Sequence, residues 1–426
     1  MSKLYGVAND LGNAALKWSI RNVTDGSEYQ TDQIPSVIAI QRPQNYEKPM
    51  VFNNLEEQDY YFEHLEDYMD ITITSPSVKT QGRMFVGNKA IDSGLPTRMF
   101  DINDYAGKSQ SDLSLILTLS RIATQVIKDE YALNGTKNLN SHLSADVIMT
   151  TALPIKEGKQ KDVIDNYKNR YTKGKHLVNI YNFDQPITVE LNFVDVYVGL
   201  EGEMAQFKIK YADDDLKTKI KKEFDESYPQ LKDEITAEDL TTVKNVLGID
   251  IGDGTTDKPI TTNGKANANA STSLPVGYGS VLQDAVAILQ DKGMNITSRG
   301  DLNSFLSTKP SPFVRDRYNL AKEVVNEQLT PLVDQIIDST SETMRNSKTG
   351  IDLVFVYGGG SIPLREHTNM RDQLVSKLKG FSGGLDIPVV WIDPSRAQTL
   401  NEDGLQMYLD HLINVYQEKQ TKDGEW

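Results

Sequence analysis

Hydrophobic and polar positions form two kinds of pattern along this chain of 426 residues. Short apolar runs of the type that forms buried strands are followed by longer segments whose apolar residues recur at helical spacing. The predicted strands cover residues 4–8, 15–23, 34–40, 84–86, 145–151, 187–198, 246–251 and 353–357. The predicted helices cover residues 113–133, 157–170, 280–290, 315–344, 364–378 and 397–416. This alternation predicts an α/β fold with mainly parallel sheets whose faces are covered by helices.

Two segments depart from this alternation. Residues 208–245 are densely charged, with Asp213, Asp214 and Asp215 close to several lysines. We expect them to form a solvated helix and loop inserted between core strands. Residues 258–275 are rich in Thr, Asn, Ala and Ser, and they are predicted to form a polar hairpin or loop.

Charge and composition narrow the classes of function. The chain has 60 Asp and Glu against 45 Lys and Arg, a formal net charge of −15, which argues against direct binding to DNA or to an anionic membrane surface. It has no Cys, which excludes disulfides, thiol catalysis and cysteine-bound zinc. No stretch reaches the roughly 18 apolar residues of a membrane span, and the first residues lack the apolar region of a secretory signal. We therefore expect a cytoplasmic protein.

The first candidate motif for chemistry follows the first predicted strand. Gly12 and Asn13 tolerate a positive φ, so a tight hairpin is expected there. The backbone amides of such a turn can hold a phosphate oxygen. Asp10, at the strand end, can bind a hydrated cation, and Lys17, on the return strand, can reach the phosphates. An ordinary Asx-Gly hairpin without chemistry is the alternative.

A second hairpin of the same kind follows the strand at residues 246–251. It consists of Asp250, Ile251, Gly252, Asp253, Gly254, Thr255, Thr256 and Asp257. Its glycines let the backbone approach a ligand closely, and its threonine hydroxyls add hydrogen-bond donors. Two Asp-x-Gly hairpins in one chain predict two similar half-domains that clamp one phosphate chain. Pro259 predicts that the second strand of this hairpin is short or lies at a sheet edge.

The third motif is a glycine run between a buried strand and a helix. Gly358, Gly359, Gly360 and Ser361 follow the strand at residues 353–357, and Pro363 is placed in the first turn of the next helix. Three glycines permit close approach by a flat ligand such as a nucleoside. A tight packing turn is the alternative.

In this order and spacing, the three motifs resemble the phosphate-1 hairpin, the phosphate-2 hairpin and the adenosine motif of the actin-like ATPase superfamily. That superfamily comprises actin, the Hsp70 chaperones and the sugar kinases. Residues 151–157 are similar to its first connecting segment, and residues 401–404 lie where the second is expected. The Asp-x-Gly-Asn hairpin and the Leu-Pro-x-x-Glu run further resemble bacterial plasmid-segregation proteins of the ParM type.

The resemblance implies a two-lobed actin-like fold, with a mixed, mainly parallel sheet flanked by helices in each lobe. The first lobe is expected to contain residues 1–155 plus 395–426, with a small subdomain at about 41–105. The second lobe is expected to contain residues 156–394, with the charged insertion at about 208–245.

The resemblance also implies a nucleotide, ATP or GTP, and Mg²⁺. Glu157 is expected to position the attacking water, and Asp250 to organise both that water and the magnesium shell. Asp10 is expected to be the second magnesium partner, with both aspartates acting through water. A surface acid at a helix start is the alternative for Glu157. Glu323 is expected to line the base pocket, with an exposed helix face as the alternative.

The function implied by the resemblance is a self-polymerising ATPase whose cytomotive filaments segregate plasmid DNA. The implied partners are further copies of the chain and a small basic DNA-binding adaptor on a centromere-like plasmid site. Neither direct DNA binding nor a membrane is expected. A small-molecule kinase and a chaperone-like ATPase of the same superfamily remain as alternatives.

Overall fold

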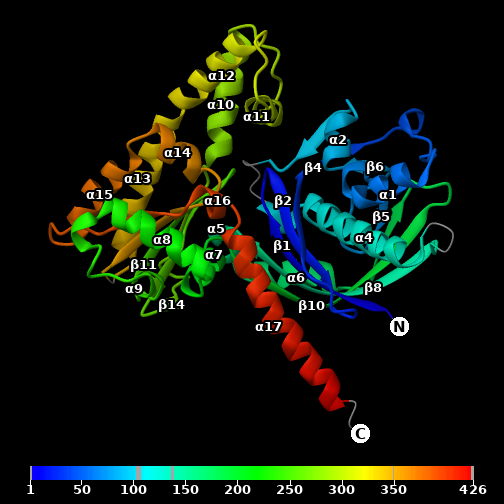
Figure 1. The fold of residues 1–426 in the computed structure, drawn as a ribbon, viewed down its shortest axis with the longest axis horizontal. Helices are drawn as coiled ribbons and strands as arrows, with labels where there is room; N and C mark the ends of the chain where they lie inside the picture. The colour runs from blue at the N-terminus through cyan, green and yellow to red at the C-terminus, as the bar shows by residue number, and fades with distance from the viewer. Residues whose placement is uncertain (1, 102–106, 136–138, 349, 424–426) are drawn as a thin grey trace. The chain divides into compact units, whose positions relative to one another are not determined.

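The computed structural model describes residues 2–101, 107–135, 139–348 and 350–423, and Figure 1 shows its ribbon. The chain divides into two compact units, and each is described by itself. Unit 1 contains Met1–Leu153, Gln160–Gly199 and Leu405–Trp426, and unit 2 contains Pro154–Lys159 and Leu200–Gly404. The largest difference from the boundaries expected from the sequence is that residues 160–199 belong to unit 1.

Unit 1 is built on one ten-stranded sheet with the order β3-β2-β1-β8-β10-β9-β5-β6-β4-β7. The strands are β1 (Lys3–Leu11), β2 (Ala15–Asn22), β3 (Gln30–Pro35), β4 (Val37–Ile40), β5 (Asp70–Thr74), β6 (Met84–Val86), β7 (Thr97–Met99), β8 (His142–Leu153), β9 (His176–Ile180) and β10 (Ile187–Leu200). The strands β9 and β10 lie inside this sheet, which is why residues 160–199 belong to unit 1.

The sheet of unit 1 is mixed, as expected. β1 pairs with β8 in parallel, whereas its pairing with β2 and the pairing of β9 with β10 are antiparallel. Antiparallel pairs also join β4, β5, β6 and β7. This is a difference from the mainly parallel arrangement expected, and it arises because short connections, which only antiparallel neighbours allow, join several of these strands.

The central helix of unit 1 is α4 (Asp112–Asn134), which is buried at every position from Leu113 to Ile127. Its buried polar side chains have partners, since the Arg121 guanidinium donates to the Gln125 side-chain oxygen at 2.9 Å and the Gln125 amide donates to the Asp129 carboxylate at 2.8 Å. Ser111 caps its start, and Gly135, at φ +62°, ends it. The other helices of unit 1 are α1 (Leu55–Glu63), α2 (Asn88–Asp92), α3 (Gly107–Gln110), α6 (Val163–Thr172) and most of α17 (Leu400–Asp423).

Unit 2 is built on a seven-stranded sheet. Its strands are β11 (Val246–Ile251), β12 (Thr256–Lys258), β13 (Ile260–Thr262), β14 (Lys265–Ala266), β15 (Thr272–Leu274), β16 (Leu353–Tyr357) and β17 (Val389–Trp391). β11, β16 and β17 run parallel to one another, and the remaining pairs are antiparallel. The sequence pattern predicts β11 and β16 as buried strands, whereas it does not predict β17.

The two faces of this sheet contact different cores. On β11, Leu247, Ile249 and Ile251 belong to one apolar cluster, whereas Val246 belongs to the other. β16 alternates in the same way, with Val354 and Val356 on one side and Phe355 on the other. Strands covered on both faces read as continuous apolar runs, and this is the pattern that their sequences have.

Helices cover both faces of the unit 2 sheet (Figure 1). The helices of this unit are α5 (Ile155–Gly158), α7 (Glu203–Lys210), α8 (Asp214–Ser227), α9 (Ala237–Thr241), α10 (Tyr278–Asp291), α11 (Arg299–Ser307), α12 (Arg315–Glu327), α13 (Leu329–Asn346), α14 (Ser361–His367), α15 (Met370–Leu378) and α16 (Pro394–Ala397). The single helix predicted over residues 315–344 is in fact two. Pro331 lies in the first turn of α13 and has no N–H to continue the hydrogen bonds of α12.

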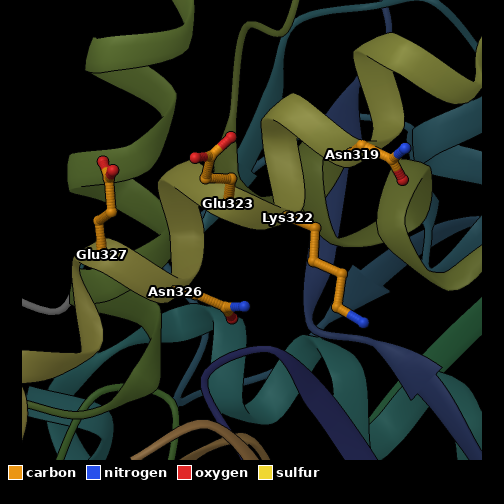
Figure 2. Close-up of a pocket in the computed structure, with 5 residues that line it drawn as sticks. All are labelled: Asn319, Lys322, Glu323, Asn326 and Glu327. Carbon is orange, nitrogen blue, oxygen red and sulfur yellow. The ribbon is translucent and has the colours of Figure 1, made fainter.

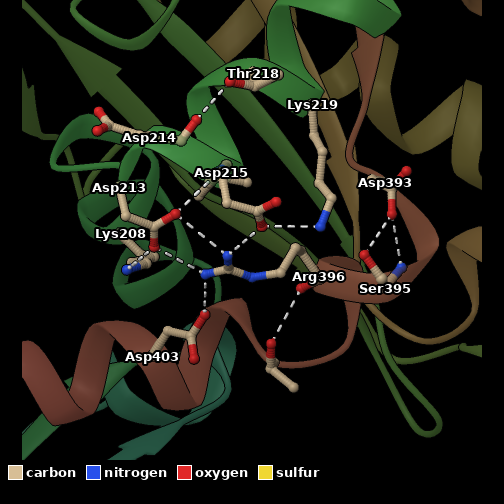
Figure 3. A network of polar contacts seen from close by, with 12 residues as sticks. Lys208, Asp213, Asp214, Asp215, Thr218, Lys219, Asp393, Ser395, Arg396 and Asp403 are labelled. Carbon is tan, nitrogen blue, oxygen red and sulfur yellow. Dashed lines mark hydrogen bonds and ion pairs between the residues drawn. The ribbon is translucent and has the colours of Figure 1, made fainter.

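The charged insertion is better packed than the sequence suggests. Along α8, Leu216, Ile220 and Phe224 are buried in the second core of unit 2, because residues four apart lie on one helix face. Figure 3 shows that the acidic start of α8 is paired. The Arg396 guanidinium lies 3.2 Å from the Asp213 carboxylate and 3.0 Å from that of Asp215. The prediction of a purely solvated insertion is therefore wrong for α8.

Residues 258–275 form the predicted polar hairpin. β13 and β14 are antiparallel, and the turn between them has Asn263 at φ 52° and Gly264 at φ 75°, as a tight hairpin turn requires. Pro259 separates β12 from β13, so β12 is short, as predicted. β12 does not lie at an edge, because it pairs with both β11 and β15. Among the described residues, none of the helices is long and apolar enough to cross a bilayer.

Candidate nucleotide-binding site

Hairpin 1, defined as residues 10–17, joins β1 to β2 in unit 1. Asp10 and Lys17 are opposite each other in the antiparallel register. The Gly12 N–H donates to the Ala15 carbonyl at 3.0 Å. A Cβ at Gly12 would lie 2.7 Å from that carbonyl oxygen. Neither Gly12 nor Asn13 adopts the positive φ predicted for this turn; glycine is required here by the close carbonyl approach.

The charged pair of hairpin 1 is loose, while its backbone is firmly held. The Lys17 ammonium lies 3.8 Å from the Asp10 carboxylate, and Asp10 is buried. The Ser36 hydroxyl donates to the Gly12 carbonyl at 2.7 Å, and the Asn9 amide donates to the Thr151 hydroxyl at 3.4 Å. The Lys17 side chain is partly exposed, so its ammonium lies at the surface beside the turn.

Hairpin 2, defined as residues 250–257, joins β11 to β12 in unit 2 and repeats this geometry. Asp250 is opposite Asp257. The Gly252 N–H donates to the Thr255 carbonyl at 2.9 Å, and a Cβ at Gly252 would lie 3.2 Å from that oxygen. The two predicted hairpins therefore share one backbone design.

The turn of hairpin 2 is fixed by two helices. The Tyr278 N–H, at the start of α10, donates to the Gly252 carbonyl at 2.9 Å, and the Gly279 N–H donates to the Asp253 carbonyl at 2.7 Å. The Asp253 carboxylate accepts from the Arg299 guanidinium of α11 at 2.7 Å. Asp253 is thus turned toward α11, where its charge is balanced.

The threonines of hairpin 2 also have partners within unit 2. The Thr255 hydroxyl donates to the Asp257 carboxylate at 2.7 Å, and the Thr256 hydroxyl donates to the Val276 carbonyl at 2.9 Å. Each hydroxyl has one donor hydrogen. Both threonines stabilise the hairpin and its surroundings here, and the phosphate contacts expected of their hydroxyls stay a prediction.

Asp250 is bound by a residue that sequence reasoning did not single out. The Asn401 side-chain amide donates to the Asp250 carboxylate at 2.6 Å. The Asn401 carbonyl oxygen in turn accepts from the backbone N–H groups of Gly202, at 2.9 Å, and Ala205, at 3.1 Å. These contacts fix which way the amide points. The only signal for Asn401 in the sequence is its place at the start of the expected second connecting segment.

Asp257 connects hairpin 2 to the helix that carries Glu157. Its carboxylate accepts from the Ile155 backbone N–H at 2.9 Å, and Ile155 is the first residue of α5. The Lys159 ammonium donates to the Ser271 carbonyl at 2.9 Å. Glu157 is half-buried in this short helix, two residues from the N–H that binds Asp257. The role expected of Glu157 stays a prediction.

The glycine run packs directly against hairpin 2. Gly358, at φ +86°, follows β16, and a Cβ there would lie 2.5 Å from the Asp250 carboxylate. The Gly360 N–H donates to the Ile251 carbonyl at 2.8 Å, and the Ser361 hydroxyl donates to the Gly358 carbonyl at 2.7 Å. Packing alone accounts for these glycines. It also places them beside Asp250 at the carboxyl ends of two parallel strands, where α/β proteins bind ligands.

Glu323 lies on α12, where its side chain is exposed. It lines a pocket of about 500 Å³ together with Asn319, Lys322, Asn326 and Glu327. In Figure 2, Glu323 and Glu327 point to one side of the helix, while Lys322 and Asn326 point to the other. The nucleoside contact expected of Glu323 stays a prediction.

Lys258 is a further residue that sequence reasoning missed. It directly follows Asp257 and is 0 % exposed, and its Nζ has no hydrogen-bond partner among the described residues. Burial lowers its pKa to about 8, against the opposing effect of Asp257 and Glu342. No pattern in the sequence distinguishes it from an exposed strand lysine.

The comparisons with known proteins agree with this arrangement. The family described as "Archaeal actin homologue MreB-like, C-terminal" matches residues 248–369, which include hairpin 2 and the glycine run. The solved structure of the actin-like protein Alp7A aligns with a TM-score of 0.64 at 15% identity, covering 98% of this chain and 99% of Alp7A. The chain has an actin-like fold. No curated protein matches its sequence.

Two further actin-like structures support this assignment. Bacillus thuringiensis ParM with AMPPNP aligns at 16% identity and a TM-score of 0.55, covering 98% of this chain and 100% of that one. The archaeal actin homologue Ta0583 aligns at 13% identity and a TM-score of 0.56, covering 96% and 99%. At these identities the likeness shows the actin-like fold, and it confirms at that level the resemblance seen in the three motifs.

Proposed function

We propose that this actin-like protein is a nucleotide-dependent ATPase that polymerises into filaments and segregates plasmid DNA. The observation that carries the proposal is the repeated hairpin, one copy in each unit, with a strand-end aspartate and a glycine in the same hydrogen-bonded turn. Two such turns suit the two sides of a phosphate chain. The ParM of Bacillus thuringiensis, which shares the fold, was solved with AMPPNP, ADP and ATP.

The residues of both units fit a magnesium nucleotide. Mg²⁺ favours one or two carboxylates together with phosphate oxygens and water, and Asp10 and Asp250 would supply the carboxylates. When bound, the ion would neutralise phosphate charge. Lys17 would bind the phosphates, and the glycine run at residues 358–361 would accept the nucleoside.

Glu157 and hairpin 2 would carry the chemistry. In phosphoryl transfer to water, a protein contributes positioning and charge stabilisation. Glu157 would accept a hydrogen bond from the attacking water and orient it. Asp257 would keep α5, and so Glu157, in place through the Ile155 N–H, and Asn401 would hold the Asp250 carboxylate in its rotamer.

The partners proposed for the filament follow from charge. A chain with a formal net charge of −15 repels DNA. A small basic adaptor bound to a centromere-like plasmid site would be attracted to it and would link the filament to the plasmid.

The test is assembly of the purified protein with Mg²⁺ and ATP, GTP, AMPPNP or no nucleotide. Sedimentation and electron microscopy should show filaments with a nucleoside triphosphate and none without, and phosphate release should follow assembly. Asp250→Ala should abolish both. Hydrolysis or phosphoryl transfer without any polymer would favour a kinase or a chaperone-like ATPase and would reject the filament.

A further inference from the structure

The turn that precedes α12 presents a bare aromatic ring. Phe313 is 95 % exposed, more than any other large apolar side chain of the described residues. The Val314 N–H donates to the Ser311 carbonyl at 3.1 Å, which closes a turn with Pro312 at its second position. Proline at that position restricts the turn before any contact forms. Phe313 therefore lies in a turn that is already rigid before binding, and this rigidity reduces the conformational entropy that is lost when the side chain is bound.

An aromatic-lined cavity of about 140 Å³ lies elsewhere in unit 2. We call it the socket, and its apolar lining is Phe207, Ile209, Tyr211, Val243, Val246 and Phe355. Tyr211 is 53 % exposed, and its ring lies edge-on to that of Phe207 at 4.9 Å. An apolar cavity of roughly 150 Å³ accommodates a benzene ring, so the socket has the volume for one phenylalanine ring.

Phe313 and the socket lie at opposite ends of unit 2. In Figure 1, the connection from α11 to α12 is at one end of this unit, and α7, α9 and β14, which form much of the socket, are at the other. Phe313 therefore cannot fill the socket of its own chain. A ring on one copy that enters a pocket on the next leaves a free ring and a free pocket at the two ends, and such a contact propagates into a filament.

The charges around the two features are complementary. Residues 309–317, around Phe313, contain Lys309, Arg315 and Arg317 against a single Asp316. The socket lining itself contains one acid, Glu203, and one lysine, Lys210. Residues 231–244, which supply Thr242 and Val243 to the lining, contain four acidic residues against two lysines. In a chain with a formal net charge of −15, a basic tip that approaches this acidic segment of the next copy reduces the repulsion between copies.

We propose that Phe313 of one copy inserts into the socket of the next copy and forms a longitudinal contact of the filament. The inference rests on the proposed function, because it concerns the assembly of this same chain. It assigns the contact to one anchor residue and one pocket, an arrangement typical of interfaces in which a buried aromatic residue contributes most of the affinity.

The socket is also connected to hairpin 2. Gln206, which lines it, donates to the Pro259 carbonyl at 3.0 Å and accepts from the Thr261 hydroxyl at 2.6 Å. The same helix, α7, begins at the Gly202 and Ala205 N–H groups that bind Asn401, the partner of Asp250. A nucleotide that moves Asp250 thus has a hydrogen-bonded route to the wall of the socket.

The first test compares two exposed apolar residues of unit 2. Phe313→Ala should raise the critical concentration by about 30-fold, the effect of removing an interface anchor, with nucleotide binding unchanged. Leu385→Ala, a matched control at a residue that is 72 % exposed, should leave it unchanged. If wild-type protein forms filaments and Phe313→Ala forms them equally well, the inference is overturned and the proposed function stands.

The second test works even without filaments. The variant Phe313→Asp lacks the ring and keeps an open socket. The variant Ala266→Arg, at an exposed residue of the socket lining, keeps the ring and has an obstructed socket. Each alone should sediment as a monomer at concentrations where their equimolar mixture gives a 1:1 dimer in analytical ultracentrifugation. A mixture that stays monomeric overturns the inference, whatever the wild-type protein does with ATP.

A covalent version of the test uses the absence of Cys in the chain. Ser311→Cys and Thr242→Cys, made in separate proteins and mixed, should be joined by a short thiol-reactive cross-linker, because Thr242 lines the socket. Ser311→Cys mixed with Leu385→Cys, at a side chain that is 72 % exposed and does not line the socket, should not react. Equal yields in the two mixtures would contradict the proposed contact.

Discussion

Hairpin 1 and hairpin 2 have the same backbone and opposite chemistry. In each, an aspartate ends a buried strand, and a glycine N–H two residues later donates to a carbonyl three residues further on. The residue opposite the aspartate is Lys17 in hairpin 1 and Asp257 in hairpin 2. The Asp-x-Gly pattern thus determines the turn, while one cross-strand position determines what the turn does.

That single position explains the division of labour we propose. Lys17 is a partly exposed ammonium at 3.8 Å from Asp10, suited to following phosphate charge. Asp257 is 2 % exposed and binds the first N–H of α5, so it is suited to positioning Glu157. In the function we propose, both hairpins contact the phosphate chain, and hairpin 2 in addition holds the glutamate that orients water.

Reversing the charge at the cross-strand position should reduce the free energy of unfolding more in hairpin 2 than in hairpin 1. Asp257→Lys places an ammonium where the Ile155 N–H and the Thr255 hydroxyl donate. We expect a loss of roughly 3–5 kcal/mol in the free energy of unfolding, the cost of an uncompensated buried charge. Lys17→Asp, at a side chain that is 25 % exposed, puts a carboxylate opposite the buried Asp10 and should cost less, about 1–2 kcal/mol, because this pair is long and partly exposed. Urea unfolding measures both losses, and equal losses would mean that the two positions are not structurally distinct.

Separating binding from hydrolysis sharpens the same contrast. Glu157→Ala should slow single-turnover phosphate release by roughly 10²–10³-fold while leaving nucleotide affinity intact, so that filaments persist. Lys17→Ala should do the reverse, weakening affinity with a smaller effect on the hydrolysis of bound nucleotide. Lys156→Ala, the exposed neighbour of Glu157, is the matched control. A Glu157→Ala protein that hydrolyses at the wild-type rate would rule out its assigned role.

The two hairpins also differ at the residue that directly follows Lys17 or Asp257 in the chain. In hairpin 1 this residue is Trp18, which is buried beneath the Arg121 guanidinium at 3.4 Å. In hairpin 2 it is Lys258, whose pKa is lowered to about 8 by burial. The Lys258 side chain therefore binds its proton more tightly in the unfolded chain than in the folded chain. Stability should therefore rise with pH from about 8 to about 10.5, by about 3 kcal/mol.

Lys258→Met tests this directly. It should stabilise the protein by roughly 1–3 kcal/mol at pH 7, because an uncharged chain of similar length replaces a buried cation. It should also remove the rise in stability between pH 8 and 9.5, below the range in which tyrosines ionise. Urea unfolding of both proteins at several pH values isolates the effect. An identical pH dependence in the two proteins would show that Lys258 is not the responsible group.

Much of this arrangement could be predicted from the sequence because it is local. An apolar strand followed by Asp-x-Gly predicts a hairpin wherever it occurs, and both hairpins, β16 and the glycine run are found where the pattern places them. The predicted reason for Gly12 was wrong, since φ is not positive there. Turn propensity describes φ and cannot show how close a carbonyl oxygen lies.

The parts that could not be predicted depend on contacts between distant segments. Asn401 binds Asp250, and Arg396 pairs with Asp213 and Asp215, across separations that no local pattern encodes. The helix break at Gln328 was missed for another reason. The apolar spacing continues from α12 into α13, and only the missing N–H of Pro331 interrupts it.

The smallest expected effect tests whether the two turns are equally tight. A Cβ at Gly12 would lie 2.7 Å from the Ala15 carbonyl oxygen, whereas a Cβ at Gly252 would lie 3.2 Å from that of Thr255. The first distance forces the backbone to move, while the second needs only a slight adjustment. We expect Gly12→Ala to cost about 2 kcal/mol and Gly252→Ala less than about 1 kcal/mol in urea unfolding. Gly300→Ala, in α11, where a Cβ would lie 3.6 Å from the Ser298 hydroxyl in an ordinary contact, should be neutral or slightly stabilising. Gly252→Ala could still weaken nucleotide affinity as much as Gly12→Ala does. That result would mean that hairpin 2 requires glycine for the close approach of the phosphates, whereas hairpin 1 requires it for folding.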